Sequence, residues 1–370
     1  MPRGSTVKRI HGQGYLASEK IASNLTRGWC LIAQRMVSEA CSKTSLGWKR
    51  SLKATTYLTL AIGVTALGLL GDGRRQRADP APDNGALRFM SWAEANTAEW
   101  DQKLHISAIR MGCSAKPADC LRAAATLIQS HPGRRVFLSV TLKSGESESY
   151  AQEYGRLSQR YPFLEEVGVD DFVQYYARLF SVGAGNPVST LAAMVDGLKS
   201  ENNALRFGIT LYENELDSQY LNEPKMSAAL RNKVDYVHLF LIYRANASNY
   251  ESYVNRAKRI FPNAKVIGGV YAYDRISYVP CKPRDSRPCT PAEEFDLFKQ
   301  SLEIQIRLLK SGQLDWLEFF PGAFGNEANW NAWDRPRICP DRKQECITNT
   351  QKMRGFIGDV FSEELGPALP

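Results

Sequence analysis

The sequence LEEVGVDDF, residues 164–172, decides how this chain folds. It has the apolar composition of a buried strand but ends in two adjacent carboxylates. An unpaired charge near a core is costly, so two acids at a strand tip suggest a role other than stability. Alternation along a strand places Glu166, Gly168 and Asp170 on one face and the valines on the other. We therefore expect Asp170 to face the interior, while Asp171 has capping of the following helix as its alternative role.

Seven other apolar runs of strand length accompany this one from residue 85 onward. Segments with helical spacing separate most of them, such as the one with Leu302, Ile306 and Leu309. Strand-then-helix repetition predicts a parallel sheet, and eight units fit a closed (β/α)8 or TIM barrel of about 250 residues. An open doubly wound sheet is the alternative, although no Gly-rich phosphate loop follows an early strand. The predicted strands are Leu87–Trp92, His105–Met111, Arg135–Leu142, Leu164–Phe172, Leu205–Tyr212, Asp235–Tyr243, Lys265–Tyr273 and Asp315–Pro321.

The N-terminal part of the chain has a different composition. Ala54–Gly71 contains no charged residue, and its 18 residues are barely enough to span a membrane. We expect a transmembrane or signal-anchor helix, or the apolar region of a cleaved signal peptide with a later start such as Met36. A buried core helix is the alternative. The predicted organisation is a basic tail at 1–53, the apolar helix at 54–71, a linker at 72–85, the barrel at 86–335 and an extension at 336–370.

The positive charge of the chain is concentrated before the apolar segment. Residues 1–54 hold 10 of the 47 Lys and Arg but only 2 of the 39 Asp and Glu, so the remainder carries no net charge. This is the positive-inside pattern of membrane topology. We expect the barrel to lie outside the cytoplasm, in the periplasm or beyond the cell, either anchored to the membrane or secreted. A nucleic-acid partner is disfavoured, because it would require the positive charge on the folded domain.

Six of the eight cysteines form three local pairs in the predicted barrel and its extension. An even number in close pairs predicts small disulfide loops in an oxidising compartment, with reduced thiols as the alternative. Zinc is disfavoured, because the pairs lack CxxC spacing and no histidine is near them. No metal or organic cofactor is expected, since the common binding motifs for them do not occur. The predicted pairs are Cys113 with Cys120, Cys281 with Cys289, and Cys339 with Cys346.

Carboxylates accompany further predicted strands. Glu318 lies in the middle of an aromatic strand, and Glu213 and Glu215 directly follow another. Together with Asp170 and Asp171 they are candidate catalytic residues, because paired carboxylates can supply a general acid and a base or nucleophile. The alternative for Glu213 and Glu215 is an exposed loop without a catalytic role.

Aromatic and amide side chains cluster near the same predicted strand ends. Aromatic rings can stack on the apolar faces of sugars, while Asn and Arg can hydrogen-bond to hydroxyls. His238, in contrast, is expected to be a core histidine with satisfied hydrogen bonds. The candidate saccharide-binding residues are Tyr212, Tyr243, Arg244, Tyr271, Tyr273, Asn329, Trp330 and Trp333.

Over about residues 85–335, the chain resembles exported bacterial glycoside-hydrolase-like (β/α)8 barrels. The resemblance implies a carboxylate pair at the barrel mouth and a saccharide substrate. The chain departs from the best-known patterns, because its fourth strand lacks the Asn-Glu ending of one large clan and the DxxDxDxE of chitinase-like enzymes. The residues that carry the resemblance are Val167–Phe172, Leu211–Glu213, Gly269–Tyr273 and Leu317–Pro321.

Three functional hypotheses follow from these observations. The first is a glycosidase with Asp170 and Glu318 as its carboxylate pair, in which Glu213 or Glu215 could replace either. The second is a barrel that binds saccharide without catalysis, within envelope or exopolysaccharide assembly. The third is a metal-dependent barrel hydrolase.

Overall fold

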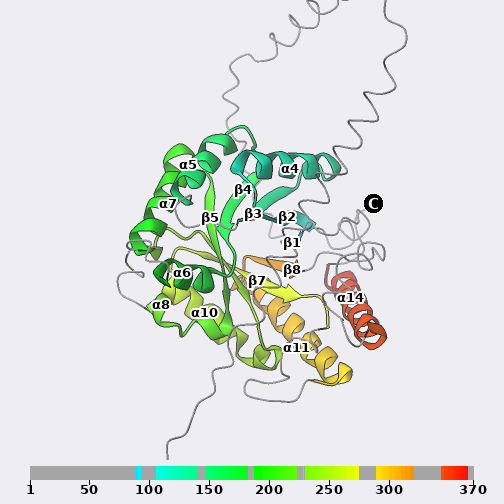
Figure 1. Cartoon of the computed structure of the whole chain (residues 1–370). Helices are drawn as coiled ribbons and strands as arrows, with labels where there is room; N and C mark the ends of the chain where they lie inside the picture. The colour runs from blue at the N-terminus through cyan, green and yellow to red at the C-terminus, as the bar shows by residue number, and fades with distance from the viewer. Residues whose placement is uncertain are drawn as a thin grey trace, which may run out of the picture. The chain divides into compact units, whose positions relative to one another are not determined.

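The described part of the chain is a closed barrel of eight parallel strands in sequence order (Figure 1). This confirms the predicted TIM barrel and excludes the open sheet. All described residues belong to one compact unit, Asp79–Pro370. The computed structural model describes residues 88–92, 106–140, 147–181, 187–222, 228, 230–274, 289–320 and 343–365.

Each strand overlaps its predicted apolar run. Strand β4 ends directly before Asp170, so both acids of the pair stand at its carboxyl end. The strands are β1 (Phe89–Trp92), β2 (Ile106–Cys113), β3 (Arg135–Val140), β4 (Leu164–Val169), β5 (Arg206–Tyr212), β6 (Tyr236–Phe240), β7 (Lys265–Tyr271) and β8 (Trp316–Phe320).

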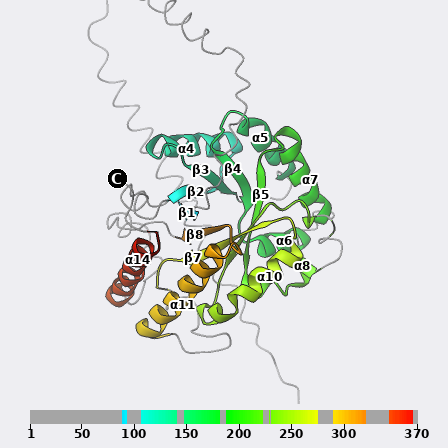
Figure 2. The same ribbon diagram turned by 180° about the vertical axis from the view of Figure 1, so that it is seen from behind.

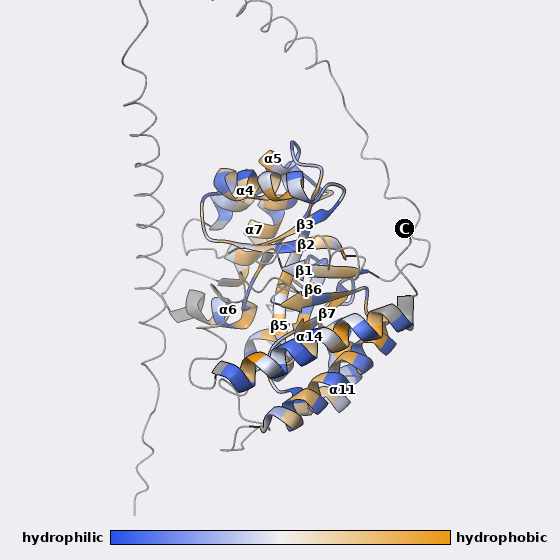
Figure 3. Ribbon diagram, turned by 90° about the vertical axis from the view of Figure 1, so that its right-hand side faces the viewer, coloured by the Kyte–Doolittle hydropathy of each residue, from blue (hydrophilic) through white to orange (hydrophobic). Residues whose placement is uncertain are grey.

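Helices form a layer around the strands, as Figures 1 and 2 show from opposite sides. Figure 3 shows apolar and polar residues alternating in bands along these helices. The α-helices are α4 (Pro117–Ser130), α5 (Ser147–Ser158), α6 (Phe172–Ser181), α7 (Pro187–Glu201), α8 (Gln219–Asn222), α10 (Tyr250–Ile260), α11 (Pro291–Lys310) and α14 (Lys343–Leu365). Two short 3₁₀ helices are η1 (Glu213–Glu215) and η2 (Arg244–Asn249).

Helix α11 shows how the sequence determines a helix start. The Thr290 hydroxyl accepts a hydrogen bond from the Glu293 backbone N–H at 3.3 Å, and the Glu293 carboxylate accepts one from the Thr290 N–H at 2.8 Å. Pro291 occupies the first helical turn, where its missing N–H costs nothing. The start of α11 is therefore fixed by local sequence close to the end of β7.

The barrel interior is apolar at the end where the strands begin. Phe137 contacts Tyr236 and Trp316 there, with ring centroids 5.5 and 5.6 Å apart. Met90, Ala108 and Ile267 complete the same buried cluster. This apolar cluster fills the interior at the end where the strands begin.

The extension predicted at 336–370 contains α14, which packs against the barrel. Phe361 contacts Phe89 of β1 and Phe319 of β8, with ring centroids 4.4 and 5.7 Å apart. Helix α14 also lies beside α11 (Figure 3). It is therefore an integral helix of this compact unit, in addition to the strand-and-helix repeat.

The disulfide predicted between Cys113 and Cys120 is confirmed, and it joins the end of β2 to α4. Cys289 and Cys346 are also disulfide-bonded. Cys281 and Cys339 lie outside the described residues, so the second and third pairings stay predictions.

Among the helices that the structure describes, none combines the length and the apolar character needed to cross a membrane. The basic tail, the apolar segment 54–71 and the linker lie outside the described residues.

Candidate functional site

Glu318 of β8 lies in the barrel interior with no exposed surface. Trp92 Nε1 donates to its Oε1 at 2.5 Å, and Arg110 Nη1 donates to both carboxylate oxygens at 2.8 and 3.0 Å. Burial alone would raise the pKa of Glu318, but the charges and hydrogen bonds of Arg110 and His238 lower it to about 2. Glu318 is therefore ionised and surrounded by protein donors.

His238 connects Glu318 to a second buried carboxylate. Its Nδ1 lies 2.5 Å from Glu318 Oε2, and its Nε2 lies 3.0 Å from Glu166 Oε2. Burial and the neighbouring Arg110 would lower the pKa of His238, but the two carboxylates raise it above its usual value. A carboxylate oxygen faces each ring nitrogen, an arrangement that suits a protonated ring, and the expectation of a satisfied core histidine is confirmed. We call Trp92, Arg110, Glu166, His238 and Glu318 the core network.

Two glycines make room for the Glu166 carboxylate. A Cβ atom at Gly168 or Gly208 would overlap the carboxylate of Glu166. These residues are partners in the register of β4 and β5, so the carboxylate lies over a stretch of sheet without side chains. The alternation of β4 predicts Glu166 and Asp170 on the same inward face, and the structure confirms that arrangement.

Arg110 links the core network to the open end of the barrel. Its Nη2 donates to Thr210 Oγ1 at 2.6 Å and lies 3.9 Å from Asp170 Oδ1. Arg110 has no exposed surface, whereas the Asp170 side chain is 42% exposed. Asp170 therefore combines an ion pair with access to solvent. Sequence reasoning missed Arg110, although a lone charge inside the apolar run of β2 is a signal that could have found it.

Asp171 has an unusual backbone conformation. Its φ is 46°, in the left-handed region that residues other than glycine seldom adopt. Its backbone oxygen accepts from the Tyr175 N–H at 2.9 Å at the start of α6, while its carboxylate accepts from the Tyr212 hydroxyl at 2.7 Å. Asp171 thus stands at the position of a helix cap and also directs its side chain to the end of β5.

Tyr212 and Tyr271 join the carboxyl ends of β5 and β7. Their hydroxyl oxygens lie 3.5 Å apart. Burial, together with Tyr271 and the negative charge of Asp171, raises the pKa of Tyr212 far above its usual value. Tyr212 therefore remains a neutral phenol that donates to Asp171.

Glu215 is a carboxyl group at this end of the barrel whose environment raises its pKa. Burial raises its pKa to about 7, helped by the negative charges of Asp171 and Glu213, although a hydrogen bond from the Tyr212 backbone N–H acts in the opposite direction. The environment of Glu215 therefore favours its protonated form. We call Asp170, Asp171, Tyr212, Glu215 and Tyr271 the mouth cluster.

Glu213 faces a different environment from Glu215. Its carboxylate is buried and accepts from the backbone N–H groups of Ile242 and Tyr243 at 2.6 and 2.8 Å. The Asn246 side chain donates to it at 3.2 Å. Glu213 therefore fixes the turn after β6, so neither it nor the half-buried Glu215 is an exposed loop carboxylate.

The structure separates the candidate saccharide-binding residues into several groups. Arg244 is buried, pairs with Glu294 of α11 and donates to the backbone oxygens of Tyr271 and Tyr273. Tyr212, Tyr243, Tyr271 and Tyr273 are half-buried at strand ends or just beyond them. Asn329, Trp330 and Trp333 lie outside the described residues.

Half-buried aromatic rings line the ends of β7 and β8. Phe320 contacts Tyr271 and Tyr273, with ring centroids 5.9 and 6.4 Å apart, and Trp92 at 5.0 Å. Within the described residues, no three metal-binding side chains converge. The described side chains that gather at this end of the barrel are carboxylates, phenols and aromatic rings.

No family model matches the sequence, and no curated protein matches it. Similar solved structures include a GH18 chitinase from Pseudoalteromonas aurantia, at 12% identity over 67% of this chain and 98% of that chain, with a TM-score of 0.44. Active domain 2 of a thermostable chitinase from Pyrococcus furiosus matches at 12% identity over 80% and 99%, with a TM-score of 0.46. A GH113 β-1,4-mannanase matches at 10% identity over 73% and 98%, with a TM-score of 0.43. These neighbours are glycoside hydrolases, but at such values the similarity carries no argument about activity.

Proposed function

We propose that this protein is a glycoside hydrolase that acts on a saccharide at the mouth of its barrel, with Asp170 and Glu215 as the working carboxylates. Both follow parallel strands at their carboxyl ends, the side where TIM-barrel enzymes place their active sites. One observation carries the proposal: two carboxyl groups at the same mouth have different environments. Glu215 has a pKa of about 7, and Asp170 forms an ion pair with Arg110.

The two environments suit two different roles. Glu215 retains a proton near neutral pH, so it is the general acid that protonates the leaving oxygen. Asp170 is partly exposed and is the negatively charged partner. It acts either as the general base that activates water or as the nucleophile that attacks the sugar. The Tyr212 hydroxyl holds Asp171, whose charge in turn helps keep Glu215 protonated.

The other predicted catalytic carboxylates have positioning roles in this proposal. Glu318 is fully buried among Trp92, Arg110 and His238, which leaves it no open side for a substrate. Glu213 binds two backbone N–H groups after β6. We therefore assign neither of them to direct contact with the sugar.

Saccharide is the favoured substrate because of the rings around these acids. The half-buried Tyr271, Tyr273 and Phe320 present aromatic surface next to hydroxyl groups, which suits the apolar faces and hydroxyls of a sugar ring. The proposed site of action is outside the cytoplasm. The disulfide at Cys113 and Cys120 supports that location, since such bonds persist in oxidising compartments.

The test is product formation from a panel of envelope and exported polysaccharides, measured as new reducing ends. Asp170→Asn and Glu215→Gln should each lower the rate about 100-fold or more while the protein stays folded. Glu303→Gln, a change at an exposed carboxylate of α11, is the matched control and should leave the rate unchanged.

Two results would overturn the proposal. Saccharide binding without product formation by the parent protein would indicate the binding-only barrel. Complete loss of activity on chelation, restored by a metal ion, would indicate the metal-dependent hydrolase instead.

A further inference from the structure

Helix α14 makes polar contacts with the residues that directly follow β7. The Asp274 backbone N–H donates to Thr350 Oγ1 at 3.0 Å, and Asn349 Nδ2 donates to Asp274 Oδ2 at 2.7 Å. Arg354 Nε lies 3.5 Å from the Ala272 backbone oxygen. Asp274, Thr350 and Arg354 are all buried, so these contacts are shielded from water.

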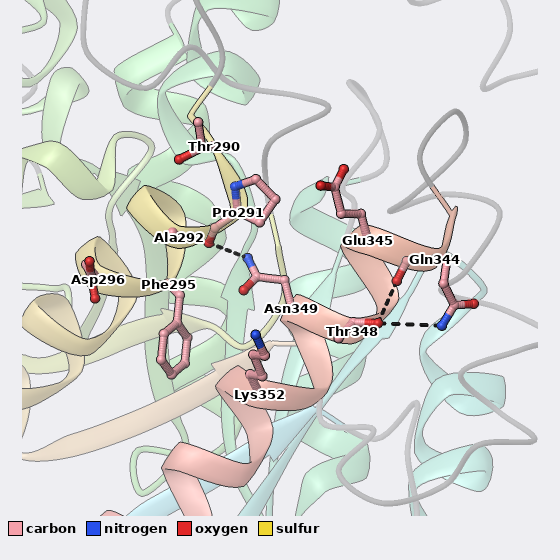
Figure 4. Close-up of a pocket in the computed structure, with 10 residues that line it drawn as sticks. All are labelled: Thr290, Pro291, Ala292, Phe295, Asp296, Gln344, Glu345, Thr348, Asn349 and Lys352. Carbon is pink, nitrogen blue, oxygen red and sulfur yellow. Dashed lines mark hydrogen bonds between the residues drawn. The ribbon is translucent and has the colours of Figure 1, made fainter.

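Asn349 also connects α14 to the beginning of α11. The same Nδ2 donates to the Pro291 backbone oxygen at 2.9 Å, and Figure 4 shows this side chain reaching across from α14 to α11. A cleft of about 750 Å³ lies between the first turns of the two helices, and Asn349 forms part of its wall. One amide group therefore fixes α14 to both α11 and the segment after β7.

The same segment is also fixed by Arg244. Its Nη2 donates to the backbone oxygens of Tyr271 and Tyr273, the latter at 2.8 Å. Its Nη1 pairs with Glu294 of α11 and lies 3.9 Å from Met353 Sδ of α14. The backbone of residues 271–274 is thus held by a guanidinium as well as by side chains of α14.

This backbone carries two tyrosines of the barrel mouth. Tyr271 and Tyr273 contact each other edge to face, with ring centroids 5.7 Å apart. The Tyr271 hydroxyl is 3.5 Å from that of Tyr212, which in turn donates to Asp171 at 2.7 Å. A continuous series of contacts therefore runs from α14 to the carboxylates of the mouth.

We infer that Asn349 and Thr350 of α14 are positioning residues for substrate binding, because they fix the backbone that presents Tyr271 and Tyr273 to the saccharide. This inference rests on the proposed function. The helix lies outside the strand-and-helix repeat but determines where two of the aromatic rings at the mouth lie. Loss of its hydrogen bonds weakens substrate binding more than it slows the chemical step.

The test uses Thr350→Val in the full chain, which keeps the side-chain shape but removes the acceptor for the Asp274 N–H. We expect KM to rise about tenfold, because the free energy of one hydrogen bond corresponds to about that factor in binding. The value of kcat should change less than about twofold. Thr350→Ser keeps the hydroxyl and should restore the parent KM. Thr348→Val is the matched control: among the described residues, the Thr348 hydroxyl bonds within α14, accepting from Gln344 Nε2 at 3.5 Å and donating to Gln344 O at 2.8 Å.

A second measurement does not depend on activity. Tetranitromethane nitrates accessible tyrosines, and mass spectrometry can follow Tyr271 and Tyr273 separately from Tyr154, which is buried under α7. Thr350→Val should raise nitration of Tyr271 and Tyr273 several-fold and leave Tyr154 unchanged. An unchanged KM together with an unchanged nitration pattern would overturn the inference. If the parent hydrolyses no saccharide, the proposed function is wrong, and the nitration pattern alone decides whether α14 positions these tyrosines.

Discussion

The core network and the mouth cluster both place carboxylates inside one barrel, but they hold them in opposite ways. Glu318 has donors around it and a pKa lowered to about 2, whereas Glu215 has one backbone donor, negative neighbours and a pKa raised to about 7. The first arrangement stabilises the negative charge of Glu318. The second keeps a proton available, which is what acid catalysis requires. Burial alone therefore does not identify a working acid; the number and sign of its partners do.

The largest expected effect follows from breaking the core network at Glu318. Glu318→Gln removes the negative charge that compensates Arg110 and His238 inside the barrel. Removing one partner of a buried ion pair costs about 3–5 kcal/mol, so the free energy of unfolding in urea should fall by that amount. The exposed change Glu303→Gln should stay within about 0.5 kcal/mol of the parent. A Glu318→Gln variant as stable as the parent would contradict the structural role of this carboxylate.

Arg110→Lys should have a smaller effect on stability and should also lower activity. Arg110 belongs to the core network, but its Nη2 also reaches Thr210 and Asp170. A lysine has a single terminal nitrogen and cannot make both sets of contacts. Stability should fall by about 1–3 kcal/mol, and kcat/KM should fall about tenfold because Asp170 loses its orientation. Loss of stability with full activity in the remaining folded protein would show that the two regions are independent.

The two carboxyl groups should respond to pH with opposite signs. The folded-state pKa of Glu215, about 7, lies above its ordinary value of 4.5, so its contribution to stability is complete below about pH 4.5 and is lost as pH rises through 7. The pKa of Glu318 is lowered to about 2, so its contribution is present above about pH 4.5 and is lost as pH falls through 2.

This difference is measurable as activity and as stability. The activity of the parent should decline above pH 7 as Glu215 ionises. The residual activity of Glu215→Gln should not show this decline. Urea unfolding between pH 5 and pH 8 should show less loss of stability for Glu215→Gln than for the parent. Identical pH dependences for the two proteins would assign the limb to another group.

The smallest effect is expected for Tyr212→Phe. This change removes the hydroxyl that donates to Asp171 and neighbours that of Tyr271, while the aromatic ring remains. The free energy of unfolding should fall by about 1 kcal/mol, the value of one hydrogen bond. Tyr161→Phe, a change at a half-buried tyrosine beyond α5, serves as the comparison and should have less effect.

The fold could be predicted from sequence because its signals are local. Each apolar run of strand length became a strand, and alternation in β4 correctly placed Glu166 and Asp170 on one face. The disulfide between Cys113 and Cys120 joins residues only 7 positions apart. Signals of this kind act within a few residues, where periodicity and spacing are informative.

The partners in the site could not be predicted, because closure of the barrel brings them together. Glu318 binds Trp92 and Arg110 across 226 and 208 positions of sequence, and no local pattern connects them. The buried roles of Glu213 and Arg244 likewise depend on backbone groups of other strands and turns. Sequence identified the strand ends where carboxylates gather, whereas the division between fully buried carboxylates and those at the barrel mouth required the three-dimensional arrangement.

The glycines at positions 168 and 208 have a consequence for anyone who redesigns this barrel. A Cβ at Gly208 would overlap the Glu166 carboxylate, so a larger side chain there needs a smaller one at position 166, whereas a Cβ at Gly168 would also lie 2.9 Å from the Gly208 backbone oxygen. Positions 166 and 208 therefore form a unit of substitution, in which changes that are each harmful can be compatible in combination. Mutational libraries that vary one position at a time would reject larger residues at position 208, while libraries that vary positions 166 and 208 together would accept some of them.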